Sequence, residues 1–283
     1  MTRLQTNVRS AKLTLSHLAT RSALAMSPKW TVKAVSKRFF TPLKFNNSPR
    51  HLELLAQGEG FTHTYQGQKL SGWRWGTGEK VLLLHGWAGR GAQFSRLIQG
   101  LVAAGYQAIT FDQPAHGEGR GRSNVFEFIE AADGVKQEFG PFAAVVGHSM
   151  GCIPALKLAN EQGLKAVLYA PGMTIKDPII KMAKGLGLYS GVVRHIFDRL
   201  EHTHNKQLAA FDPKTQLESL TTPVLILHDK ADKYTSAADS AAVSQGLAHI
   251  TYHQTQNLGH SKILEDPETV AKALAFLQDV VVS

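Results

Sequence analysis

Acidic side chains are absent from the first 50 residues, which hold ten lysines and arginines and no aspartate or glutamate. Residues 51–283 carry 21 basic and 22 acidic side chains, so the net charge of +9 arises entirely in the N-terminal segment. A nucleic-acid enzyme would concentrate its basic residues along its working domain. The near-neutral remainder therefore excludes nucleic acid as the expected partner.

Long apolar runs and cysteine pairs are also missing. The N-terminal segment has no apolar stretch near the roughly 20 residues that a membrane-spanning helix needs. Its leucines are separated by polar residues, unlike the continuous centre of a secretory signal. The single cysteine, Cys152, allows no intrachain disulfide. These features favour a cytoplasmic protein.

The basic segment leaves three interpretations open. It could be a structural arm packed on the domain, an organelle targeting segment, or a surface on which residues 1–45 make peripheral contact with an anionic membrane. The last interpretation depends on apolar residues that alternate with cations, namely Trp30, Val32, Lys33, Val35, Lys37, Arg38, Phe39 and Phe40.

Metal-ligand spacing is absent as well, although the chain has 13 histidines. His202 and His204 form a His-Thr-His pattern, but no cysteine or carboxylate set accompanies them. Zinc sites in proteins need three or four ligands at defined spacing. We expect neither a metal nor a cofactor.

Apolar segments instead alternate between the patterns of strands and helices. This alternation predicts one α/β domain with a mostly parallel sheet covered by helices. Eight strands are expected, at residues 61–65, 70–75, 81–84, 106–112, 142–147, 164–170, 223–228 and 249–254.

The pentapeptide Gly147-His148-Ser149-Met150-Gly151 follows the fifth of these strands and precedes a helical pattern. A tight turn between a strand and a helix requires glycine at its flanking positions and leaves the serine exposed in a strained conformation. Ser149 is therefore a candidate nucleophile. Cys152, on the following helix, is expected to be a buried and inert thiol.

A serine hydroxyl needs a base within hydrogen-bond reach and an acid that orients that base. Two downstream loops supply candidates. The strand ending at Leu227 is followed by Asp229 and Asp232, and His260 follows the last strand. Asp232 and His260 fit the chain order nucleophile, acid, base, and Asp229 is a rival acid. Backbone amides of Trp87 and Met150 are the candidate oxyanion donors.

These elements resemble the α/β-hydrolase superfamily, and specifically its serine esterase and lipase-like members. The resemblance implies an eight-stranded α/β-hydrolase core at residues 59–172 and 216–283. The basic segment before it, at residues 1–58, is expected to be an arm with helical segments. Five motifs carry the resemblance in family order: His85-Gly86-Trp87, Phe111 to Gly117, Gly147 to Gly151, His228 to Asp232, and Gly259-His260. Asp232 matches the family acid, although Asp229 stands where the family usually has glycine.

Residues 173–215 form a connection too long for an ordinary loop and have a helical pattern of their own. We expect a small inserted helical cap. Its apolar side chains could roof an acyl pocket or simply pack the cap on the core. The candidate substrate contacts are His85, Met173, Met182 and Leu186.

The expected activity is hydrolysis of small carboxylic esters with short to medium acyl chains through an acyl-enzyme. Fold and triad do not determine the substrate. A thioesterase, a lysophospholipase-type lipid hydrolase and a non-catalytic binding member of the fold remain alternatives.

Overall fold

A computed structural model describes residues 3–278 of the chain, with side chains described from residue 14 onward. The contacts divide the chain into two compact units. The first unit comprises residues 1–41 and 174–210, and the second comprises residues 42–173 and 211–283. The outermost residues of the expected arm and core, 1–2 and 279–283, lie outside the described residues.

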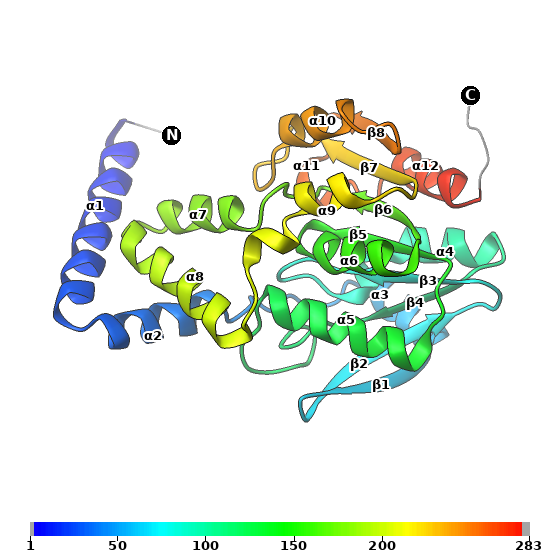
Figure 1. The fold of residues 1–283 in the computed structure, drawn as a ribbon, viewed down its shortest axis with the longest axis horizontal. Helices are drawn as coiled ribbons and strands as arrows, with labels where there is room; N and C mark the ends of the chain where they lie inside the picture. The colour runs from blue at the N-terminus through cyan, green and yellow to red at the C-terminus, as the bar shows by residue number, and fades with distance from the viewer. Residues whose placement is uncertain (1–2, 279–283) are drawn as a thin grey trace. The chain divides into compact units, whose positions relative to one another are not determined.

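The second unit is built on one eight-stranded sheet, as the sequence predicted (Figure 1). The strand order is β1-β2-β4-β3-β5-β6-β7-β8, and strands from β4 onward in this order pair in parallel. The strands are β1 (Glu59–Tyr65), β2 (Gln68–Trp75), β3 (Lys80–Leu84), β4 (Gln107–Phe111), β5 (Ala144–His148), β6 (Lys165–Tyr169), β7 (Val224–Asp229) and β8 (Ile250–Thr255).

Helices cover both faces of this sheet. Along β3, Leu82 and Leu84 belong to one apolar cluster and Val81 and Leu83 to another, which is the alternation of a strand buried on both sides. Each fully buried aliphatic side chain stabilises the fold by about 2 kcal/mol. The helices of this unit are α3 (Pro49–Gln57), α4 (Ser95–Ala103), α5 (Val125–Phe139), α6 (Cys152–Gln162), α9 (Pro213–Ser219), α10 (Ala237–Gln245), α11 (Gly259–Lys262) and α12 (Pro267–Leu277).

Residues 42–58 belong to the sheet unit. The Lys44 ammonium donates to the carbonyl oxygens of Ala115 at 2.6 Å and Gly117 at 2.9 Å, and also to that of Gly119. The Trp75 indole donates to the Leu54 carbonyl at 2.9 Å. The basic segment thus divides between the two units after residue 41.

The first unit joins two distant parts of the sequence. It contains α1 (Arg3–Met26), α2 (Pro28–Phe39), α7 (Lys176–Gly185) and α8 (Ser190–His204). Its apolar core consists of Leu24, Val32, Val192 and Ile196. Helix α2 therefore buries its apolar stripe against α8 of the insertion. None of the described helices is both long and apolar enough to cross a bilayer.

Candidate active site

Ser149 occupies a sharp turn between β5 and α6. Its φ angle is 53°, a left-handed conformation that non-glycine residues seldom adopt without strain. A Cβ atom on Gly147 would lie 2.6 Å from the Cys152 Cα, and one on Gly151 would lie 2.1 Å from the Leu84 carbonyl oxygen. Both glycines are required for this close packing. Ser149 itself is partly exposed, directly after the carboxyl end of β5.

His260 and Asp232 meet at the ends of β8 and β7. The His260 Nδ1 lies 2.6 Å from Asp232 Oδ2, and the Asp232 side chain is fully buried. The other oxygen, Oδ1, accepts from the amides of Tyr234 at 2.8 Å and Thr235 at 3.1 Å. This network fixes the orientation of the carboxylate toward the imidazole.

A second histidine supports the same carboxylate from inside the unit. His228 is fully buried, and its Nε2 lies 3.3 Å from Asp232 Oδ2 while Nδ1 contacts the Ser240 hydroxyl at 2.8 Å. Burial raises the pKa of Asp232, but hydrogen bonds from His228 and His260 outweigh it and hold that pKa below its ordinary value. Sequence reasoning missed this role, for which the only signal was a histidine four residues before the acid.

Asp229 serves the loops around the site. Its Oδ1 accepts from the Ala231 amide at 2.8 Å, and its Oδ2 accepts from the Thr255 hydroxyl at 2.7 Å and the Leu258 amide at 3.0 Å. Burial raises the pKa of Asp229, but these hydrogen bonds outweigh that effect and lower it. Among the described residues, Asp232 is the carboxylate that contacts the His260 ring.

His148 holds His260 beside the turn of Ser149. Its Nε2 donates to the His260 carbonyl at 2.8 Å, its Nδ1 accepts from the Gln93 amide at 3.1 Å, and the two imidazoles are 4.9 Å apart. The sequence indicated only that His148 lies near the nucleophile. Its contact with His260 depends on the packing of β5 against the loop after β8.

The loop after β3 abuts the same turn. A Cβ atom on Gly86 would lie 2.8 Å from the Ser149 Cβ, so the backbone leading to Trp87 passes directly beside the candidate nucleophile. The Trp87 ring packs against His116 and Phe128, with centroids 5.2 Å and 6.4 Å apart. Met150 is the residue after Ser149 in the same turn.

The candidate substrate contacts lie in different places. His85 is fully buried. Its Nδ1 donates to the Gly86 carbonyl at 2.8 Å, and its Nε2 accepts from the Gln113 amide at 2.9 Å. These contacts fit a structural role in which His85 connects two loops. Met173 is buried in the core of the second unit. Met182 and Leu186 are exposed in the first unit, where their contact with substrate stays a prediction.

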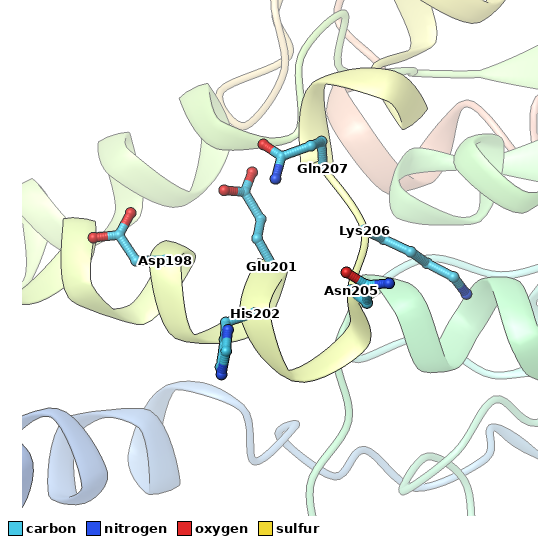
Figure 2. A pocket seen from close by; sticks show the side chains of 6 residues that line it. All are labelled: Asp198, Glu201, His202, Asn205, Lys206 and Gln207. Atoms are coloured by element: carbon cyan, nitrogen blue, oxygen red, sulfur yellow. The ribbon is translucent and has the colours of Figure 1, made fainter.

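A shallow hollow of about 460 Å³ lies at the end of α8 in the first unit (Figure 2). Its lining residue Glu201 accepts from the Leu208 amide at 3.0 Å and contacts Lys176 at 3.1 Å. Within residues 3–278, no group of three metal-ligating side chains is found, including the area of His202. The hollow offers no chemistry comparable with the cluster around His260. Its lining residues are Asp198, Glu201, His202, Asn205, Lys206 and Gln207.

Buried neutral histidines make the second unit sensitive to acid. Burial lowers the pKa of His148 to about 3 and that of His116 to about 4. Between these values and about 6.5, the unfolded chain binds protons that the folded chain does not, so each histidine lowers the free energy of unfolding by about 1.4 kcal/mol per pH unit on acidification. We expect denaturant midpoints to fall as pH drops below 6.5.

The variant His148→Gln should be less stable at pH 7 but lose stability less steeply between pH 6.5 and 4. His17→Gln is the matched control because His17 is exposed in the first unit. An unchanged slope in His148→Gln, measured by urea unfolding at each pH, would contradict the assigned protonation state.

Residues 81–273 match the model of the alpha/beta hydrolase family, and this chain belongs to that family. A curated relative, the non-heme chloroperoxidase CPO-A1 of Kitasatospora aureofaciens, is 26% identical over 132 residues. That match covers 45% of this chain and 47% of the relative, so the chain matches about half of the relative's length.

Two solved structures resemble the fold at low sequence identity. The esterase Pf2001 of Pyrococcus furiosus has a TM-score of 0.61 at 19% identity and covers 84% of this chain and 95% of its own. A bacterial membrane phospholipase A has a TM-score of 0.62 at 16% identity. The match covers 93% of this chain and 95% of the phospholipase chain. At these identities the likeness establishes the fold, while activity depends on the site.

Proposed function

We propose that this protein is a serine hydrolase that cleaves carboxylic esters through an acyl-enzyme. The observation that carries the proposal is the 2.6 Å contact between His260 Nδ1 and Asp232 Oδ2, next to a serine held at φ 53°. A carboxylate only accepts hydrogen bonds, so Nδ1 is the donor and the remaining nitrogen, Nε2, is free to act as a base.

The reaction has two steps. In the first, His260 takes the Ser149 proton as the hydroxyl oxygen attacks the ester carbonyl, and Asp232 stabilises the resulting imidazolium. The backbone amides of Trp87 and Met150 donate to the oxyanion of the tetrahedral intermediate. Collapse of that intermediate expels the alcohol, which receives the proton from His260.

In the second step, water attacks the acyl-enzyme carbonyl while His260 removes its proton. The acid product leaves, and the proton returns to the Ser149 oxygen. No cofactor or metal enters either step. Attack by water thus regenerates the free enzyme.

A small uncharged ester with a short or medium acyl chain suits the second unit because that unit is nearly neutral. Thioesters and lysophospholipids contain the same acyl carbonyl and remain the alternative substrates. One structural neighbour is a membrane phospholipase A, which keeps lysophospholipids among the alternative substrates.

A fluorophosphonate probe tests the proposal directly. The intact protein should be labelled at Ser149, and p-nitrophenyl esters of increasing acyl length should show a maximum in kcat/KM at short or medium length. Cys152→Ala is the matched control because its thiol is buried and burial raises its pKa, so labelling should persist. Absence of labelling in the intact protein would favour a non-catalytic binding member of the fold.

A further inference from the structure

The net positive charge of the protein resides in the first unit. Residues 1–41 hold eight lysines and arginines and no acid, and residues 174–210 hold six with three acids, which gives this unit a net charge of +11. Since the whole chain carries +9, the sheet unit carries −2. The excess of cations over acids therefore belongs to a helical module and not to the unit that holds Ser149.

The N-terminal helix of this module has two distinct faces. Ser16, Thr20 and Leu24 lie on its inner face: the Ser16 hydroxyl donates to the Leu186 carbonyl at 3.1 Å, the Thr20 hydroxyl accepts from the Tyr189 amide at 3.1 Å, and Leu24 is buried. The helical period of 3.6 residues per turn places Leu15, Leu18 and Met26 on the opposite face. These side chains are exposed by 67%, 50% and 86%.

Helix α2 begins after a corner at residue 27 and runs in a different direction from α1 (Figure 1). Val32 and Ser36 are buried on its inner side, whereas Trp30, Lys33 and Lys37 share the outer side at helical spacing and are exposed. We call the outward side chains of both helices the α1–α2 face. Its members are Leu15, Leu18, Met26, Lys29, Trp30, Lys33 and Lys37.

We propose that the α1–α2 face docks the protein on the surface of an anionic phospholipid bilayer. Exposed leucine, methionine and tryptophan flanked by lysines is the composition of helices that lie in the interface plane of membranes. Tryptophan partitions to the headgroup level, and lysines attract anionic headgroups. The surface that binds this face must be anionic because the helical unit carries a net charge of +11. The same charge opposes dimerisation of two copies through this face.

Docking goes beyond ester hydrolysis and does not require it. It makes a lipid surface a partner of the helical module, while the proposed chemistry belongs to residues of the sheet unit. Membrane binding and turnover can therefore be measured and lost separately.

Co-sedimentation of the full chain with vesicles tests the charge component. The protein should pellet with vesicles of phosphatidylcholine mixed with phosphatidylglycerol and not with phosphatidylcholine alone, and raised salt should release it. The triple variant K29E, K33E and K37E should lower the partition coefficient on the order of 100-fold. Binding that is independent of phosphatidylglycerol would overturn the proposal.

A matched triple variant separates the contribution of the α1–α2 face to vesicle binding from that of overall net charge. K69E, R120E and K214E replace three exposed cations of the sheet unit and change the total charge equally. This control should bind vesicles within a few-fold of the unaltered protein. Equal losses in both triple variants would show that overall charge, and not the α1–α2 face, governs binding.

Quenching by brominated lipid tests insertion. Trp30 is exposed, whereas Trp73, Trp75 and Trp87 belong to the sheet unit. Bromolipid should quench part of the fluorescence of the unaltered protein, and Trp30→Phe should abolish that part. Quenching that persists in Trp30→Phe would refute contact through α2.

Two further measurements separate membrane binding from catalysis and from nucleic-acid binding. Hydrolysis of a soluble p-nitrophenyl ester should be unchanged in K29E, K33E and K37E, and Ser149→Ala should bind vesicles normally. An oligonucleotide that displaces the protein from vesicles by tighter binding at equal salt would overturn the membrane proposal in favour of nucleic acid. Failure to displace it supports the lipid surface.

Discussion

Ser149→Ala is expected to lower kcat/KM for p-nitrophenyl esters on the order of 10⁴-fold or more. Nucleophile and base act as one unit, so removing either abolishes the covalent route and leaves only the contribution of substrate binding and the oxyanion donors. The left-handed φ of Ser149 makes alanine no worse for the backbone than serine, so the variant should fold.

Steady-state kinetics measures this loss, with circular dichroism confirming the fold. Cys152→Ala should keep kcat/KM within a few-fold because the Cys152 thiol donates to the Tyr169 carbonyl at 3.6 Å and points away from solvent. Near-native turnover in Ser149→Ala would reject Ser149 as nucleophile.

Asp232→Asn is expected to lower kcat/KM on the order of 10³-fold or more. An amide at this position can donate to His260 Nδ1 and select the tautomer whose Nε2 carries the proton, which cannot accept the proton of Ser149. The imidazolium also loses its counter-charge. The hydrogen bonds from Tyr234 and Thr235 amides can still be accepted by the Asn oxygen.

Asp229→Asn is the matched control, three residues away at the end of the same strand. It should leave kcat/KM within about tenfold but lower the free energy of unfolding by about 1–3 kcal/mol, because a charged acceptor of several hydrogen bonds is lost. The reverse pattern, severe loss in Asp229→Asn and mild loss in Asp232→Asn, would make Asp229 the acid. Kinetics and urea unfolding of both variants decide between them.

Much of the fold could be predicted because its signals are local. The eight strands are short apolar runs bounded by polar or glycine residues, and helical patterns lie between them. The family match over residues 81–273 and the observed sheet confirm the α/β-hydrolase fold. Strand ends differ from the expected ones by at most two residues, as at β1, which begins at Glu59 where residue 61 was expected.

The candidate site could be predicted only in part. A strand, a glycine-flanked serine and a helix are contiguous, so the turn at Ser149 was evident. The supports of His260 were not evident. His148 contacts it across 112 residues of sequence, and His228 acts on it only through Asp232, which lies 28 residues before His260. Such contacts depend on how parallel strands place their carboxyl ends at one edge of the sheet.

The sequence by itself determined the order of the strands along the chain, the glycine-flanked turn at Ser149, and the confinement of excess positive charge to residues before 51. These follow from local sterics and from composition. Only the tertiary structure decided that Asp232 and not Asp229 contacts the His260 ring, and that residues 1–41 join residues 174–210 in one helical unit. Both depend on pairing between segments far apart in the chain, where a difference of three residues at a strand end changes which loop a carboxylate faces.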